Sequence, residues 1–185
     1  VSIPGTVVQL GWCAFYACSS LKSITLPESV VKMDAYVFRE CTALEKVNIP
    51  DKVPMLGEHV FAECKSLKTI RIPKGVTHIV SYAFDGCTGI STLPLPEALT
   101  YIGGSAFNGC TLLDGSLSIP AGITQISDSA FKDCSSLTGI AIPGDVTYIG
   151  ANAFNGCTGF TEMTIPNSVQ TLGNGCLPLS LTKLT

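Results

Sequence analysis

Nine cysteines are the residues of this chain best suited to chemistry, because thiols can form disulfides, bind metals or act as nucleophiles. Seven of them recur every 23 or 24 residues, each with a phenylalanine three residues before it and an apolar residue three residues after it. This pattern predicts a column of buried free thiols, since free cysteine packs as a small hydrophobic residue. Cys13 and Cys176 lie outside the column, and we expect Cys13 to be the more accessible thiol. The column consists of Cys18, Cys41, Cys64, Cys87, Cys110, Cys134 and Cys157.

The two histidines, His59 and His78, occupy different positions relative to the preceding prolines, so we interpret them as exposed loop residues. A zinc site needs Cys/His pairs at close spacing, and none is present in the sequence. A serine or cysteine nucleophile would lack a suitably placed histidine as its base. Gly103-Gly104 is a repeat turn and lacks the pattern of a phosphate-binding loop. The sequence therefore predicts no enzyme, no metal and no cofactor.

A repeat of 23 or 24 residues positions these side chains, and residues 143–166 are its template. A fixed period in this range predicts a solenoid, in which each repeat buries its apolar face against its neighbours. We expect one domain over residues 1–185, with about seven repeats, that starts and ends within a repeat. The prolines that mark the period are Pro4, Pro27, Pro50, Pro73, Pro96, Pro120, Pro143 and Pro166.

Each repeat divides into a strand and a return segment, which predicts an α/β leucine-rich-repeat solenoid with a parallel β-sheet on its concave face. The strands alternate apolar and polar residues, and the proline ends each one because it cannot donate to a ladder. The return segment carries apolar residues three and six positions after the proline and then a short helical turn, which would lie on the convex face. Gly86, Gly109 and Gly156 suit a helix end that needs a left-handed residue. The expected strands are residues 21–26, 44–49, 67–72, 90–95, 137–142 and 160–165.

Two irregularities lie in the middle of the repeat array. The fifth repeat has one extra residue near 114–116, which predicts a local bulge. Pro94 lies within the fourth predicted strand and removes one ladder donor. We therefore expect the sheet to be most disturbed at its centre.

Composition excludes some classes of protein. The net charge of −3 is no signature of nucleic-acid binding, and the apolar runs are too short to span a bilayer. The chain begins with Val1 in mid-repeat, which suggests a processed or truncated product. Because solenoids need capped ends, we expect at least one end to be exposed or covered by a second copy, giving a possible homo-oligomer.

The pattern I-P-x-x-[VI]-T-x-I-G-x-x-A-F-x-G-C-x-x-L-x-x-I-x-I-P resembles the BspA-like leucine-rich repeat, and the resemblance covers essentially the whole chain. It implies a protein of a bacterial or protozoan surface. Known binders of that family attach to host matrix proteins such as fibronectin and fibrinogen, to host cells or to other bacteria. No functional residue transfers, because the motif consists of core residues and a fold does not determine a ligand.

Outward strand positions in the first three repeats carry four basic residues and one acidic residue, whereas later repeats carry no basic and two acidic ones. Such a basic patch could bind an acidic protein surface or a sulfated glycan. The alternative is that it is a solvated face that keeps the protein soluble. Tyrosines at turn positions form a second candidate surface, since tyrosine often anchors interfaces, or they lie flat over the neighbouring turn. The candidates on the concave face are Lys22, Glu45, Lys46, Lys68 and Arg71, and the tyrosines are Tyr36, Tyr82, Tyr101 and Tyr148.

These observations favour a non-catalytic module that binds a protein ligand, such as a host matrix protein or cell-surface receptor, or an acidic glycan. The expected location is the cell surface, the periplasm or the secreted fraction. The alternative hypothesis is a structural spacer or scaffold that assembles end to end. We expect neither nucleic-acid binding nor membrane insertion.

Overall fold

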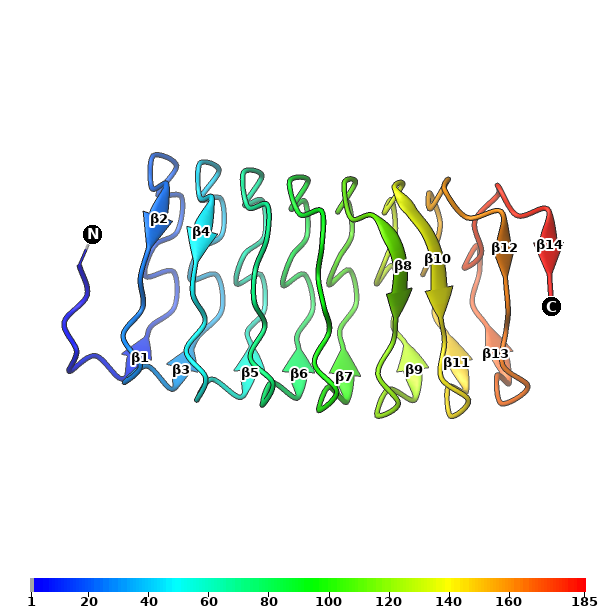
Figure 1. Cartoon of the computed structure of the whole chain (residues 1–185), viewed down its shortest axis with the longest axis horizontal. Coiled ribbons are helices and arrows are strands. Elements are labelled where there is room, and N and C mark those ends of the chain that lie inside the picture. Colours follow the sequence, from blue (N-terminus) through cyan, green and yellow to red (C-terminus); the bar gives the residue numbers. More distant parts are fainter. Residues whose placement is uncertain (1) are drawn as a thin grey trace.

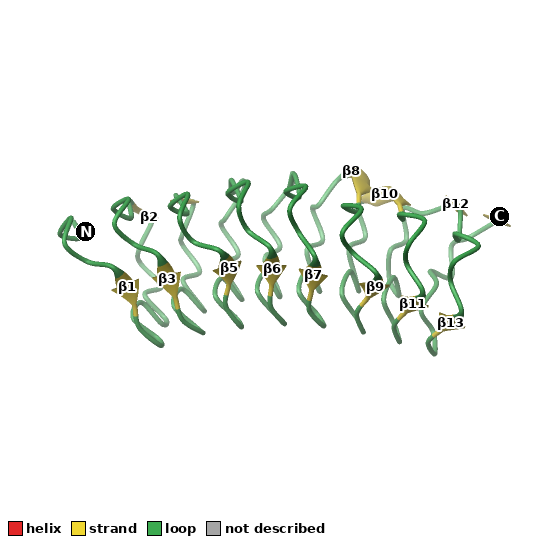
Figure 2. Cartoon of the chain, turned by 90° about the horizontal axis from the view of Figure 1, so that it is seen from below, coloured by secondary structure: helices red, strands yellow, loops and turns green. Residues whose placement is uncertain are grey.

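The computed structural model describes residues 2–185 as a series of coils, each one repeat long, stacked along a single axis (Figure 1). The predicted solenoid is therefore confirmed. Short strands lie on two different sides of the stack, which we call the first and second strand rows (Figure 2). Nearly all contacts between elements are consequently contacts between neighbouring coils.

The first strand row lies before the prolines, where the sequence predicts strands, but its strands are shorter than expected. Its pairing is parallel and runs between β2 and β4, between β8 and β10, and between β12 and β14. Ser2–Thr25 and Thr69–Thr92 add isolated parallel bridges. The row contains β2 (Ser23–Ile24), β4 (Lys46–Val47), β8 (Gly115–Ser118), β10 (Leu137–Ala141), β12 (Glu162–Met163) and β14 (Lys183–Leu184).

The second strand row was not predicted, because in the sequence it shows only one regularly apolar position, six residues after each proline. That residue points inward and its predecessor outward, so two residues per coil suffice for a parallel ladder. The row contains β1 (Gln9–Leu10), β3 (Lys32–Met33), β5 (Met55–Leu56), β6 (His78–Ile79), β7 (Tyr101–Ile102), β9 (Gln125–Ile126), β11 (Tyr148–Ile149) and β13 (Thr171–Leu172).

The predicted short helical turns are wrong, because no residue in 2–185 lies in a helix. Hydrogen bonding in these turns alternates between the same coil and the next one: Cys64 N donates to Phe61 O at 3.1 Å, whereas Phe61 N donates to Ala83 O at 2.9 Å. Tyr82 and Gly86 have φ values of 60° and 67°, which a right-handed helix cannot accommodate. We call these segments the turn row; they comprise residues 12–17, 35–40, 58–63, 81–86, 104–109, 128–133 and 151–156.

The core runs unbroken along the axis. Phenylalanines from successive coils stack face to face, with ring centroids 5.5 Å apart both for Phe61–Phe84 and for Phe84–Phe107. The cysteine column lies beside them and is buried from Cys41 to Cys157. Because one set of residue types recurs in register, the apolar surface of each coil is covered by two neighbours.

The central disturbance predicted for the first strand row is confirmed. Within residues 90–95 the row has only the Thr69–Thr92 bridge, since Pro94 has no N–H to donate. The register of β10 against β8 shifts between Leu137 and Gly139, opposite the segment with the extra residue, where Gly115 adopts φ +77°. The ladder is therefore open between two better paired ends.

Candidate binding surface

The five residues predicted on the sheet face are all exposed on the first three complete coils. Glu45 N donates to Lys22 O at 2.8 Å, and Ser91 N donates to Lys68 O at 3.1 Å, which holds these positions at the spacing of adjacent coils. We call Lys22, Lys46, Lys68 and Arg71 the basic face. The side chains of the basic face are exposed, whereas those of Ile24 and Val47 are buried in the core.

Most of the positive charge of the basic face is not neutralised. Arg71 Nη2 lies 2.7 Å from Asp51 Oδ1, but both side chains are about two-thirds exposed, so this ion pair contributes little to stability. Lys22, Lys46 and Lys68 form no ion pair with any residue in the described part of the chain. Three lysines are thus available to an anionic ligand.

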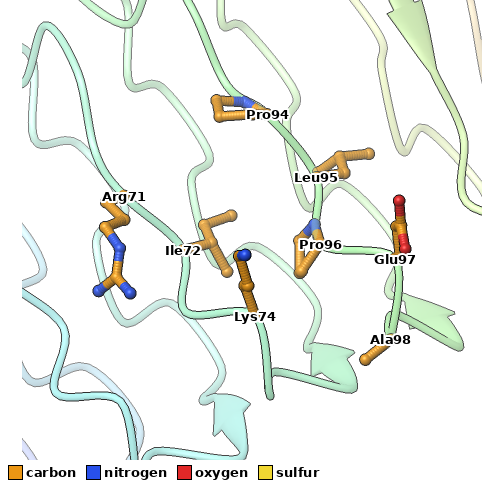
Figure 3. A pocket seen from close by; sticks show the side chains of 8 residues that line it. All are labelled: Arg71, Ile72, Lys74, Pro94, Leu95, Pro96, Glu97 and Ala98. Atoms are coloured by element: carbon orange, nitrogen blue, oxygen red, sulfur yellow. The ribbon is translucent and has the colours of Figure 1, made fainter.

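Two open depressions meet at Arg71. One, of about 510 Å³, joins Lys46 and Arg71 with the polar side chains of Ser23, Thr25, Asn48 and Thr69. The other, of about 540 Å³, lies where Pro94 interrupts the ladder (Figure 3). There one coil contributes Arg71, Ile72 and Lys74, and the next contributes Pro94, Leu95, Pro96, Glu97 and Ala98.

The structure does not bring all five predicted residues into one site. Glu45 and Lys68 line a separate depression with Lys65, and Lys22 lines none of these three. Sequence reasoning missed Asp51, Lys74 and Glu97, which follow the prolines directly. The sequence contains a pattern that could have predicted them. Each is a charged residue directly after a strand-ending proline, so all three must lie at the same edge of the first strand row.

The predicted tyrosine surface is divided between two places. Tyr36 and Tyr82 belong to the turn row, where they hold His59 between them, with ring centroids 4.7 Å and 4.5 Å from it. Trp12 extends this set at 5.8 Å from Tyr36, and we call these four residues the aromatic ladder. Tyr101 and Tyr148 lie in the second strand row instead.

Of the two histidines, His78 is exposed as expected, but His59 is not: its side chain is only 17% exposed. Burial, together with the nearby Arg39 guanidinium, lowers the pKa of His59. In the second strand row, Tyr148 donates to Asp128 Oδ1 at 3.1 Å, and this hydrogen bond raises the pKa of the Tyr148 phenol.

The cysteines are free, and six of the seven column thiols are buried. Cys18 is the exception, because in the described chain its coil has no neighbour on the N-terminal side. Cys13 is exposed as predicted, whereas Cys176 is buried. Residues 2–185 contain no group of three or more His, Cys, Asp or Glu side chains that could hold a metal ion. No helix long and apolar enough to cross a bilayer occurs in the described residues.

Comparison with known proteins points to one family. A family model described as BspA type leucine rich repeat region, in six copies, matches residues 1–114 and 114–184. A leucine rich repeat protein of T. pallidum has 27% identity and a TM-score of 0.73, with 88% of this chain and 73% of that chain covered. A leucine-rich repeat protein from Bacteroides ovatus has 26% identity and a TM-score of 0.67, with 96% and 58% covered.

More distant structures show the same fold. A leucine rich cell surface protein from Faecalibacterium prausnitzii has 21% identity and a TM-score of 0.53, with 98% of this chain and 77% of that chain covered. At this identity the likeness supports the fold alone. No curated protein matches the chain.

Proposed function

The chain belongs to the BspA-type leucine-rich repeat family, and from this premise we propose that it is a non-catalytic attachment module whose basic face binds an acidic partner. Proteins of this repeat family are generally protein-binding or surface proteins. The proposed partner is an acidic surface of a host matrix or cell-surface protein, or a sulfated glycan. The proposed location is the exterior of a bacterial cell.

One observation carries this proposal: Lys22, Lys46 and Lys68 lie on successive coils of one exposed face and have no ion-pairing partner in the described chain. Glu45 lies between Lys22 and Lys68 at the equivalent strand position, and Lys46 pairs in register with Ser23, so the lysines are not stacked directly on one another. Glu45 is the one acidic residue among the five predicted on this face, so the face keeps an excess of positive charge. Together with Arg71 the three lysines produce a local positive potential on a chain whose net charge is −3. Such a potential attracts anionic ligands and depends strongly on ionic strength.

The depressions beside Arg71 support the same proposal. The depression lined by Lys46 and Arg71 presents the hydroxyl groups of Ser23 and Thr25 next to these cations, while the Asn48 amide is bonded to the backbone of Leu26. Sulfate and carboxylate groups are recognised by this combination of charged and neutral donors, and arginine can bind them in a bidentate manner.

The test is a binding assay on immobilised fibronectin, fibrinogen and heparin across a salt series. We expect saturable binding to at least one of them that weakens as salt rises. The double variant Lys46→Glu/Lys68→Glu should weaken it by roughly tenfold or more and flatten the salt dependence.

A matched control is Lys32→Glu/Lys132→Glu, which changes the net charge equally but lies in the second strand row and the turn row. We expect this control to bind almost as the unaltered protein does. If the two double variants lose affinity equally, the basic face is not the site. Absence of binding to all three ligands, with light scattering showing chains of copies, would instead favour an assembly role.

A further inference from the structure

The aromatic ladder ends abruptly at Tyr82. Its ring stacks on His59 with an interplanar angle of 3°, so its other face points along the axis towards the next coil. That coil carries Ser105 at the equivalent position, and the following one carries Ser129. Tyr82 is 39% exposed although it lies in the middle of the solenoid, which means that no further ring covers its second face.

Asp85 follows Tyr82 by three residues in the same turn and provides a carboxylate there. Asp85 N donates to Tyr82 O at 3.1 Å across one turn, and Asn108 Nδ2 donates to Asp85 Oδ1 at 2.7 Å. Asn108 therefore draws the carboxylate towards the coil of Ser105, and Asp85 Oδ2 has no hydrogen-bond partner in residues 2–185. The turn that carries Tyr82 thus offers a hydrogen-bond acceptor with a negative charge.

The ladder already holds one guanidinium, against the Tyr36 ring. Arg39 occupies the same position in its coil that Asp85 occupies two coils later. Its Cζ lies 5.6 Å from the centroid of the Tyr36 ring. A side chain at this position thus reaches the ring of its own coil. Asp85 has a shorter side chain at the equivalent position, so a guanidinium stacked on Tyr82 would have to extend its N–H groups towards the Asp85 carboxylate.

Charge in the turn row favours a cationic ligand. The seven segments of this row contain six acidic residues and two basic ones, so the row is negative by four charges. The acidic residues are Glu40, Glu58, Glu63, Asp85, Asp128 and Asp133, and the basic ones are Arg39 and Lys132.

We propose that the open face of Tyr82, above Ser105 and beside Asp85, binds the guanidinium of an arginine on a partner protein. A guanidinium is planar, so it continues the stack at ring spacing, and its N–H groups supply only donors to a site that presents a carboxylate acceptor. A lysine ammonium cannot stack in this way. A sugar ring could stack as well, but the negative charge of the row gives a neutral sugar no advantage.

This site is independent of the basic face. It lies on the turn row, selects the opposite charge and shares no residue with Lys22, Lys46, Lys68 or Arg71. Failure of one proposal therefore leaves the other intact.

The experiment follows the ring resonances of Tyr82 and His59 by NMR during titration with acetyl-Gly-Gly-Arg-Gly-Gly-amide. The matched peptides carry lysine or citrulline instead of arginine. We expect the arginine peptide to shift the Tyr82 resonances at concentrations roughly tenfold below those needed for the lysine peptide.

Ser105→Tyr is the decisive variant, since it extends the ladder by one ring and occupies the proposed position. Ser105 has φ 54°, close to the 60° of Tyr82, so the backbone already has the conformation that a tyrosine adopts in the ladder. Ser129→Tyr, one coil further, is the matched control because it leaves the face of Tyr82 open. We expect Ser105→Tyr to abolish the arginine response and Ser129→Tyr to keep it.

Asp85→Asn keeps the shape of the site and removes its charge, so it tests the site even if Ser105→Tyr fails to fold. It should weaken arginine binding by roughly tenfold, the loss expected of a charge-assisted hydrogen bond. Equal responses to the arginine and lysine peptides, or an unchanged response in Asp85→Asn, would overturn the proposal. Shifts caused by neutral methyl glycosides and not by the arginine peptide would replace it with a saccharide site.

Discussion

The Cys64 thiol donates a hydrogen bond of 3.1 Å to the carbonyl oxygen of Phe38, one coil earlier. The same oxygen also accepts the backbone N–H of Cys41 at 3.1 Å, so both of its lone pairs are used. Equivalent thiol bonds of 3.0–3.3 Å run along the whole column from Cys41 to Cys157. Each cysteine therefore fills space in the core and satisfies a buried backbone acceptor.

Thiol reactivity should divide the nine cysteines into two classes. Burial raises the pKa of Cys41 to about 11 and that of Cys157 to about 12, so these thiols stay protonated and covered at neutral pH. Cys13 and Cys18 are exposed. We expect two thiols to react rapidly with a disulfide reagent in the native protein and all nine to react in denaturant. In Cys13→Ser/Cys18→Ser the rapid phase should vanish, and a surviving rapid phase would show that the column is open.

Stability should depend strongly on single phenylalanines of the stack. Phe84 is fully buried between Phe61 and Phe107, so Phe84→Ala leaves a cavity that two rigid neighbouring coils cannot close. We expect the free energy of unfolding in urea to fall by about 3–5 kcal/mol. Val31→Ala is the control, because Val31 is a large exposed apolar residue and its truncation should cost less than about 0.5 kcal/mol. Equal losses would contradict the assignment of the stack as core.

Neighbouring coils approach each other so closely at Gly103 that any larger residue there should destabilise the protein. A Cβ on Gly103 would lie 2.4 Å from Ser81 N and 2.8 Å from Ser81 Cα, and these backbone atoms cannot rotate away. Gly103→Ala should therefore lower the midpoint of thermal unfolding, at a cost of about 1–3 kcal/mol. Gly144→Ala has no atom within 4 Å of the added carbon, so its midpoint should remain within error of the original. A tolerated Gly103→Ala would mean that the coils are further apart than the structure shows.

Protonation of His59 should lower the stability of the protein as the pH decreases. The pKa of His59 is lowered in the folded protein, so between the folded and the unfolded pKa values the unfolded chain binds more protons. The stabilisation is thus present above the unfolded value of about 6.5 and is lost as pH decreases through the folded value.

The corresponding measurement compares the unprotonatable variant His59→Phe with the original protein by thermal unfolding from pH 7.5 to pH 4.5. The original should lose more stability than the variant as the solution becomes more acidic. His78→Phe is the control, because His78 is exposed, and it should follow the original protein. A pH profile of His59→Phe identical to that of the original would exclude His59 as the cause.

Period and residue type were sufficient to predict the solenoid, the buried cysteine column and the disturbance at Pro94. Each of these follows from the chemistry of one residue repeated in register: phenylalanine and cysteine need burial, and proline lacks an N–H. The prediction failed in the turn row, where a phenylalanine spaced three residues from a cysteine suits a helical turn and an inter-coil turn equally. The two kinds of turn differ only in the acceptors of their N–H groups: Phe61 N, for example, donates to Ala83 O of the next coil.

The candidate sites divide in the same way. From the sequence alone, the repeat register assigns Lys22, Lys46, Lys68 and Arg71 to positions outside the regularly apolar ones, and therefore to the exposed side of adjacent coils. Tertiary structure alone decided that Asp51 pairs with Arg71, that Tyr36 and Tyr82 enclose His59, and that Tyr82 keeps one face open above Ser105. Those relationships depend on side-chain directions at left-handed turn positions and on the spacing between coils, which a linear pattern of residue types does not contain.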